Sequence, residues 1–195
     1  MIGRLRQQVA VCELCNLHEG RINPVFDKGN PNAILMICGM VPAKDENMQG
    51  EPFVGRAGKL LDVILAAAGL TYDDVYITNL VKCFVAAGQS LEKSWVDSCR
   101  PYLMEQIRII NPHVIITLGA DASRSLCTLS GNMPMKDMRG RILHRTKETM
   151  IVPTYHPSYL LRKGGVNSDA YKEVLVDFDL AKKCLKEMIK MAIYI

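Results

Sequence analysis

Four cysteines are the residues of this chain whose type and spacing most clearly suit chemistry. Cys12 and Cys15 form a CxxC pair near the N-terminus, and Cys83 and Cys99 lie far downstream. Four thiolates that converge from two chain segments can bind a tetrahedral zinc ion or an iron–sulfur cluster. Spacing alone does not separate these two ligands. Buried thiols, a redox-active pair and a disulfide remain alternatives.

The other three cysteines fit a structural role. Cys38 lies in an apolar run, and Cys127 and Cys184 fall on the apolar faces of predicted helices. We expect all three in the core, where free cysteine behaves as a small hydrophobic residue. The odd total of seven cysteines and the lack of an apolar signal core at the N-terminus predict a reducing, cytoplasmic location.

A second set of residues could hold a ligand. Segment 39–53 is the longest stretch without a regular pattern that follows a strand-like run, and its glycines let backbone amides approach a ligand. Asn79 ends another such run, and its amide offers the donor and acceptor that suit a pyrimidine edge. Phe53 could stack on a base, and His156 could donate to developing negative charge. Each also has an ordinary alternative: a surface loop, an amide bonded to local backbone, a core aromatic ring or a structural histidine.

Four apolar, β-branched runs predict the strands that would position these residues. They are 33–40, 75–80, 114–119 and 150–155. Their continuous apolar character is typical of strands buried on both faces of a sheet. Helical patterns lie between and after them, over 58–68, 91–110, 120–129 and 168–192. This alternation predicts an α/β fold with a mostly parallel sheet, helices on both faces and right-handed crossovers.

Such a fold places its ligand site at the carboxyl ends of the strands. Segment 39–46 follows the first run, Asn79 ends the second, Gly119 ends the third, and His156 follows the fourth. The polar groups therefore gather at the edge of the sheet where a site belongs.

Length and composition set wider limits. A chain of 195 residues suits one large core, so we expect a single domain over 1–195. The net charge of +4 and the pI near 8.7 permit a polyanionic partner without requiring one. No apolar run reaches membrane-spanning length, so we expect no membrane partner.

Five motifs, taken together, resemble those of the family 4, or iron–sulfur, uracil-DNA glycosylases. They are Cys12-Glu-Leu-Cys15-Asn-Leu-His-Glu-Gly-Arg, Gly50-Glu-Pro-Phe53-Val-Gly-Arg-Ala-Gly-Lys-Leu-Leu, Tyr76-Ile-Thr-Asn79-Leu-Val-Lys-Cys83, Cys99-Arg-Pro-Tyr-Leu and His156-Pro-Ser-Tyr-Leu-Leu-Arg162. The resemblance covers about residues 12–162. It implies a three-layer α/β/α sandwich with a four-stranded parallel sheet. It also implies a monomeric DNA-repair enzyme that hydrolyses the N-glycosidic bond of uracil, or a related deaminated base, in single- or double-stranded DNA and leaves an abasic site.

The resemblance also implies a cofactor and a set of roles. A [4Fe-4S] cluster would sit on Cys12, Cys15, Cys83 and Cys99, with zinc as the alternative. Phe53 would stack on the extruded uracil, Asn79 would read its N3–H and O4 edge, and His156 would stabilise charge on O2. The remaining residues that the resemblance assigns are Gly39, Met40 and Val41 in the uracil site, Glu46 as a catalytic carboxylate, and Arg139, Arg162 and Lys163 as DNA contacts. Those three cations also fit solvated surface positions.

The first motif departs from the family pattern. The family has Gly-Glu-Ala/Gly-Pro-Gly followed by acidic residues, whereas this chain has Met40 in place of the glutamate, Val41 in place of a small residue and Ala43 in place of a glycine. Glu46 keeps a carboxylate that would fence the 5-position of the base or position water. The departure leaves a rival function open: a cluster-bearing protein that binds DNA or a damaged base with little turnover.

Overall fold

Four parallel strands form the centre of one sheet in the computed structural model, which describes residues 1–127, 129, 131, 133–146 and 148–193. They are β2 (Leu35–Gly39), β3 (Val75–Asn79), β4 (Val114–Leu118) and β6 (Met150–Thr154). Their order is β3-β2-β4-β6, with the antiparallel strand β1 (Lys28–Gly29) beside β3 and β5 (His144–Arg145) beside β6. The four predicted parallel strands are confirmed, but the sheet has six strands in the described part of the chain, because an antiparallel strand is added at each edge. The two edge strands have two residues each, too few to leave a pattern in the sequence.

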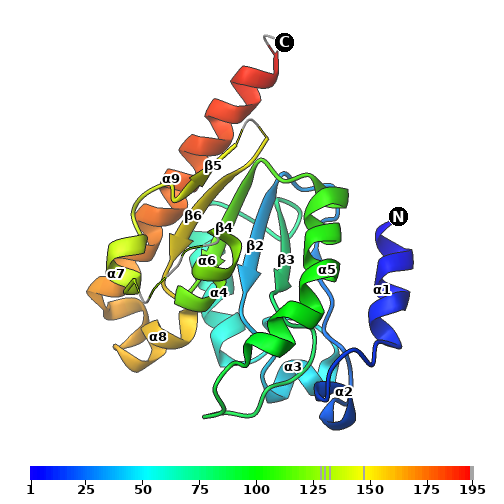
Figure 1. Cartoon of the computed structure of the whole chain (residues 1–195). Helices are drawn as coiled ribbons and strands as arrows, with labels where there is room; N and C mark the ends of the chain where they lie inside the picture. The colour runs from blue at the N-terminus through cyan, green and yellow to red at the C-terminus, as the bar shows by residue number, and fades with distance from the viewer. Residues whose placement is uncertain (128, 130, 132, 147, 194–195) are drawn as a thin grey trace.

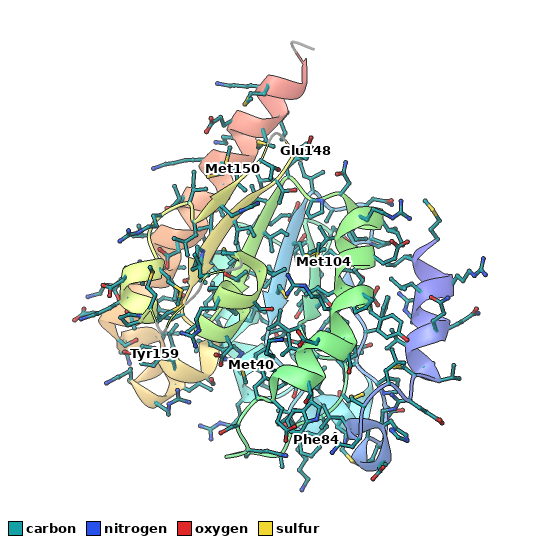
Figure 2. All side chains as sticks on the ribbon, viewed as in Figure 1. Met40, Phe84, Met104, Glu148, Met150 and Tyr159 are labelled. Atoms are coloured by element: carbon teal, nitrogen blue, oxygen red, sulfur yellow. The ribbon has the colours of Figure 1, made fainter. Side chains whose placement is uncertain are left out.

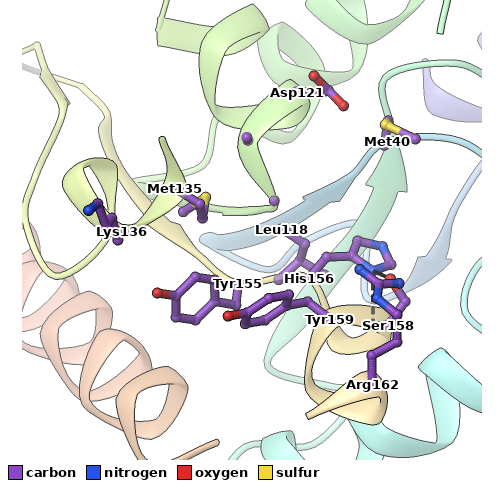
Figure 3. Close-up of a pocket in the computed structure, with 12 residues that line it drawn as sticks. Met40, Leu118, Asp121, Met135, Lys136, Tyr155, His156, Ser158, Tyr159 and Arg162 are labelled. Atoms are coloured by element: carbon purple, nitrogen blue, oxygen red, sulfur yellow. Dashed lines mark hydrogen bonds between the residues drawn. The ribbon is translucent and has the colours of Figure 1, made fainter. Parts of the chain in front are cut away.

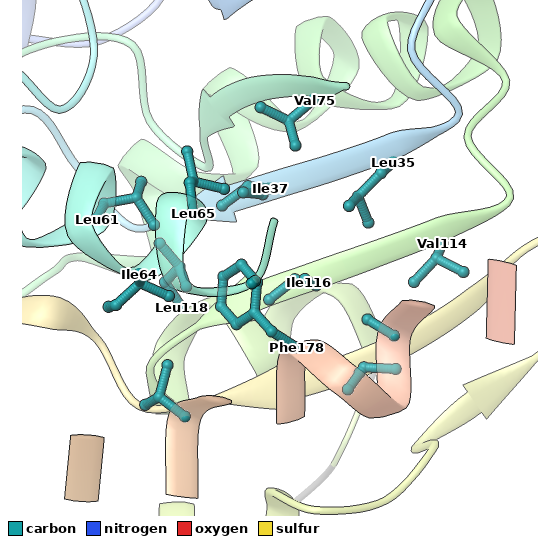
Figure 4. Close-up of a cluster of buried hydrophobic side chains, with 14 of the residues drawn as sticks. Leu35, Ile37, Leu61, Ile64, Leu65, Val75, Val114, Ile116, Leu118 and Phe178 are labelled. Atoms are coloured by element: carbon teal, nitrogen blue, oxygen red, sulfur yellow. The ribbon is translucent and has the colours of Figure 1, made fainter. Parts of the chain in front are cut away.

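Helices cover both faces of this sheet (Figure 1), so the predicted three layers are confirmed. Leu35 and Ile37 point to the face covered by α4 (Arg56–Ala67) and α9 (Asp169–Ile193), where Phe178 packs among the strand residues (Figure 4). The alternate residues Met36 and Cys38 point to the face covered by α5 (Lys93–Ile110) and α6 (Ala120–Cys127). Every residue of the four central strands is buried, which explains their continuous apolar runs.

The four predicted helices are confirmed within a few residues. The helix predicted over 120–129 extends to Cys127, and residue 128 lies outside the described residues. Cys38, Cys127 and Cys184 are all buried in the core, as predicted. No helix in the described part of the chain is long and apolar enough to cross a membrane.

Several short elements add to the predicted set. They are α1 (Ile2–Ala10), α2 (Leu17–Gly20), α3 (Lys44–Gln49), α7 (Met135–Met138), α8 (Pro157–Arg162) and the 3₁₀-helix η1 (Gly165–Asn167). Helix α3 corrects the expectation that 39–53 lacks regular structure. Helix α1 lies outside α5 (Figure 1), where Leu5 and Val9 bury Phe26.

The chain order places a natural site at the centre of the sheet. From β2 the chain proceeds to β3 on one side and then returns to β4 on the other, so the strand order reverses beside β2. In open α/β sheets, ligands bind outside the carboxyl ends of the strands at such a reversal. This edge is the lower one in Figure 1, and Figure 2 labels Met40 and Tyr159 there.

Candidate active site

Gly39, Phe53 and Asn79 meet at the carboxyl ends of β2 and β3. The parallel register pairs Gly39 with Asn79. A Cβ atom added at Gly39 would lie 2.3 Å from Oδ1 of Asn79 and 2.7 Å from Cζ of Phe53. Real Cβ atoms do not approach other atoms so closely. Glycine at position 39 therefore allows an aromatic ring and an amide to come together over the strand end, and both of these side chains are buried.

The backbone around Phe53 is held in an unusual conformation. Phe53 has a φ of 56°, in the left-handed region that a bulky side chain seldom adopts. The first turn of α4 packs directly on it, since a Cβ at Gly58 would lie 1.8 Å from the Phe53 carbonyl oxygen. Strain of this kind persists where the surroundings fix it, and it is concentrated at functional sites. The loop thus presents the Phe53 ring in one position.

Glu46 holds this loop together through backbone hydrogen bonds; its expected catalytic role stays a prediction. Its carboxylate accepts hydrogen bonds from the backbone N–H groups of Ala43 at 3.0 Å and of Val54 and Gly55 at 3.1 Å each. The side chain is 6% exposed. Three backbone donors occupy its oxygens, so the carboxylate joins the start of α3 to the segment after Phe53.

His156 is fixed as a neutral hydrogen-bond donor. It caps α8, and its Nδ1 accepts from the backbone N–H of Ser158 at 3.1 Å and lies 2.8 Å from the Ser158 hydroxyl (Figure 3). Because Nδ1 accepts, the ring proton of the neutral form is on Nε2. Burial, with a smaller effect of Arg162, lowers the pKa of His156 to about 4. Its ring centroid lies 6.0 Å from that of Phe53, so the imidazole lies beside the Phe53 ring.

A cavity of about 510 Å³ opens beside His156. Its lining residues come from the ends of β2, β4 and β6 and from α6, α7 and α8; they are Met40, Leu118, Gly119, Ala120, Asp121, Met135, Lys136, Tyr155, His156, Ser158, Tyr159 and Arg162. Tyr155 and Tyr159 stack with centroids 4.7 Å apart on one wall (Figure 3). Lys136 and Arg162 bring exposed cations to this cavity. The chemistry of the lining suits a polyanionic chain with bases attached.

The three predicted DNA contacts divide into two groups. Arg162 and Lys163 are exposed, and the Lys163 ammonium lies 5.7 Å from the centre of the Tyr159 ring. Arg139 is different: its side chain is 14% exposed and forms ion pairs with Asp177 at 2.8 Å and Glu173 at 3.2 Å. Asp177 is fully buried, so these bonds hold the end of α7 against α9. The expectation of a phosphate contact at Arg139 is therefore wrong.

Met40 and Val41 leave β2 in different directions. Met40 lines the cavity beside His156, and its carbonyl accepts from the backbone N–H of Val81 at 3.1 Å. Val41 packs with the residues on the α5 side of the sheet, whereas Phe53 packs on the α4 side. Met40 thus lies in the cavity with His156, and Val41 lies on the other side of the sheet from the Phe53 ring.

The four cysteines of the two predicted pairs surround one small cavity. Cys12, Cys15, Cys83 and Cys99 line it. Arg21 Nη1 lies 3.4 Å from the Cys83 sulfur, and Lys82 also lines this cavity. Donors aimed at sulfur stabilise thiolates, so the donor set suits a metal group. Among the described residues, no three His, Cys, Asp or Glu side chains converge on a point where one metal ion could bind.

Comparisons with known proteins agree with this site. The model of the uracil DNA glycosylase superfamily matches residues 26–179. The chain is 36% identical to the type-4 uracil-DNA glycosylase of Thermotoga maritima over 93% of each chain. It is 37% identical to that of Sulfurisphaera tokodaii, over 82% of this chain and 76% of the relative. The chain therefore belongs to the uracil-DNA glycosylase superfamily.

Within that superfamily, this chain is a member of the type-4 branch. Its identity to the type-5 uracil-DNA glycosylase of Pyrobaculum aerophilum is lower, 27% over 78% of this chain and 74% of the relative. The type-4 enzyme of the same organism is 35% identical over 91% of this chain and 93% of the relative.

Sequence reasoning missed several residues of this site. Ser158 sets the tautomer of His156, and Lys136 and Tyr159 line the cavity. The bond to Ser158 had a signal, because the side chain of a residue at a helix start commonly accepts from the backbone N–H two positions later. Lys136 had none, since its place depends on how α7 returns to the sheet.

Proposed function

We propose that this protein removes uracil from DNA by hydrolysing the N-glycosidic bond, which leaves an abasic site. The observation that carries the proposal is the meeting of Gly39, Phe53 and Asn79 beside the neutral His156. The aromatic face can stack on a pyrimidine, and the amide can recognise its hydrogen-bonding edge. The ring N–H donor can stabilise the base as it leaves the sugar. The names of the type-4 relatives support the same reaction.

Recognition would begin with a uracil that has left the base stack, at a cost of a few kcal/mol. Stacking on the Phe53 ring would return about 1–3 kcal/mol. The Asn79 amide would donate to O4 and accept from N3–H, a pattern that cytosine does not match. Both side chains are preorganised, because Gly39 and the strained backbone at Phe53 fix them before the base arrives.

Catalysis would depend on charge that develops as the bond breaks. The sugar becomes oxocarbenium-like, and negative charge gathers on O2 of the departing uracil. A donor aimed at O2 strengthens as this charge grows, so it stabilises the transition state more than the bound substrate. The Nε2–H group of His156 would supply that donor, and Ser158 would keep its proton on Nε2.

The cavity beside His156 would hold the DNA strand that carries the uracil. Arg162 and Lys136 are exposed there, Lys163 is exposed beside the Tyr159 ring, and all three would contact phosphates. Such contacts position the strand without reading its sequence. We also propose that the chain acts as a single domain and a monomer in the cytoplasm, where its seven cysteines would stay reduced.

We propose a [4Fe-4S] cluster on Cys12, Cys15, Cys83 and Cys99. In such a cluster each cysteine binds its own iron, so the four sulfurs need not converge on one ion. Membership of the type-4 branch supports the cluster over zinc. These cysteines belong to the segment after α1, to the loop after β3 and to α5, so the bound group would tie the N-terminal segment to the strand that carries Asn79.

A cleavage assay tests the proposed function. Protein purified without oxygen is mixed with single- and double-stranded oligonucleotides that contain one uracil or one thymine, and alkali then cuts any abasic site. We expect a cut at uracil alone, and much less of it with His156→Ala. Tight binding without a cut in either substrate would favour the rival function, a protein that binds DNA or a damaged base.

Metal analysis of the same protein tests the cofactor. We expect brown protein with iron and sulfide, and an absorbance that dithionite bleaches. A colourless preparation that holds stoichiometric zinc would overturn the cluster.

A further inference from the structure

Lys82 lies fully inside the protein, between the uracil-reading strand end and the four cysteines. Its side chain is 1% exposed, which is rare for lysine unless the ammonium is paired. The Nζ atom donates to Oγ1 of Thr78 at 2.7 Å and to the main-chain oxygen of Asn79 at 2.6 Å. Lys82 also lines the cavity that the four cysteines surround. One residue thus touches both regions.

The bond from Lys82 to the Asn79 carbonyl takes the place of a strand hydrogen bond that β1 is too short to form. Strand β1 pairs with Tyr76 and Ile77 of β3 and extends no further. On this edge the carbonyl of Asn79 is beyond the reach of β1, and a buried carbonyl without a donor is costly. The Lys82 ammonium donates to that carbonyl and so holds the main chain from which the Asn79 amide projects. The Thr78 hydroxyl in turn donates to the Phe26 carbonyl at 2.8 Å, which links β3 to the segment before β1.

The charge of Lys82 needs a partner that these two oxygens do not supply. Both are neutral, and Lys82 forms no ion pair with a carboxylate in the part of the chain that the structure describes. A buried ammonium without an anion is strongly disfavoured. The four cysteines become anionic when they bind a metal group, and Lys82 lines the cavity that they surround.

We propose that Lys82 is a positioning residue that couples the two sites: its ammonium is the counter-charge of the four-thiolate group and holds the main chain of Asn79 in register to read uracil. This inference rests on the proposed function and names how that function depends on the cysteine site. It predicts that the cluster does more than tie two segments together, because it stabilises the charge that fixes the base reader.

The test uses full-length, cluster-loaded protein with Lys82→Met, Lys82→Gln and the control Lys183→Met, which replaces an exposed lysine of α9. One measurement is the lifetime of the cluster absorbance in air. A second is hydrogen exchange at the amides of Leu80 and Val81, which bond to the carbonyls of Gly39 and Met40. A third is the single-turnover excision rate per loaded molecule, on uracil and on cytosine.

We expect Lys82→Met to shorten the cluster lifetime and to lower uracil excision, each by about 10–100-fold, the usual effect of removing a partner that orients metal ligands or reactive groups. Exchange at Leu80 and Val81 should rise, and the preference for uracil over cytosine should fall. Lys82→Gln keeps a donor without the charge, so its cluster should be as short-lived as that of Lys82→Met while more of the uracil preference remains.

Either of two results would overturn the proposal. One is a normal cluster lifetime in both neutral variants. The other is normal excision and normal uracil preference in loaded Lys82→Met. If Lys82→Met does not fold, the cluster lifetime of Lys82→Gln decides whether the proposal stands. If the wild-type protein releases no uracil, the proposed function fails, but the role of Lys82 is still tested by the cluster lifetime and by hydrogen exchange at Leu80 and Val81.

Discussion

The proposed base site, formed by Gly39, Phe53 and Asn79, and the cavity beside His156 lie side by side at one edge of the sheet, yet they are built differently. At the base site, Phe53 and Asn79 are 5% and 2% exposed and are packed against Gly39 with no room for one more atom. In the cavity, the cations Lys136 and Arg162 are exposed and project from short helices. His156 belongs to both regions.

This difference separates two tasks. Discrimination between bases that differ by one donor needs fixed groups, because a buried polar group left unpaired by the wrong base is costly. Binding of a phosphate chain needs only charge in the right region, and flexible exposed side chains supply it. Changes at the base site should therefore alter chemistry and base choice, and changes in the cavity should alter affinity.

The largest loss is expected from His156→Ala. Removal of one donor to developing charge typically costs on the order of 10²–10³ in rate. Single-turnover rates at saturating enzyme measure it, and DNA affinity should change little. Ser158→Ala is the matched control, because it keeps the ring and one Nδ1 bond; its loss should be smaller. Equal losses in rate and in affinity would mean that His156 only binds DNA.

The next largest loss is expected from Gly39→Ala. The added methyl group would lie 2.3 Å from Oδ1 of Asn79, so the amide or the Phe53 ring must move. A displacement of about 1 Å at a reacting centre can cost about 10²-fold in rate. Gly3→Ala is the control, because nothing lies within 4 Å of its added Cβ. Normal excision by Gly39→Ala would show that close packing at β2 is not needed.

A smaller effect is expected from Met40→Glu, and it should be a gain in the rate of uracil excision. Met40 lines the cavity beside His156 at the position where the family pattern has glutamate. If a carboxylate there helps to orient water, its return should raise the single-turnover rate several-fold without tighter DNA binding. Val41→Gly is the comparison, since Val41 packs on the other side of the sheet. An unchanged rate in Met40→Glu would show that this site works without the acid.

The smallest effect on catalysis is expected from Arg162→Ala. Loss of one phosphate contact should weaken DNA binding similarly for all sequences and reduce the salt slope by about 1. Arg139→Ala is the contrast: it leaves Asp177 buried without its cation, which typically costs about 3–5 kcal/mol of folding stability. Salt titrations of DNA binding test Arg162→Ala, and thermal unfolding tests Arg139→Ala. An unchanged salt dependence of DNA binding in Arg162→Ala would show that Arg162 does not contact the DNA.

The sequence predicted the parts of this molecule that depend on local pattern. Apolar runs located the four central strands, and the ends of those strands located Gly39, Asn79 and His156. It did not predict what Glu46 and Arg139 do, because a carboxylate or a guanidinium looks the same in sequence whether its partners are backbone amides, a buried aspartate or a substrate. The cavity also escaped prediction, since it forms only when α7 and α8 return to the sheet.

The tautomer of His156 tests the central claim most directly. The account requires a neutral ring with its proton on Nε2, because Nδ1 accepts from the backbone of Ser158 and because burial lowers the pKa to about 4. Because its pKa is lowered, the His156 ring stays neutral as the pH falls below the ordinary histidine value near 6.5, and it gains a second proton only near pH 4. Nitrogen-15 NMR of histidine-labelled protein reports the protonation of each ring nitrogen.

Between pH 5.5 and 8, the account predicts a pyrrole-type signal at Nε2 and a pyridine-type signal at Nδ1 for His156, both unchanged with pH. A proton on Nδ1, or a ring that gains a second proton within that range, would contradict it.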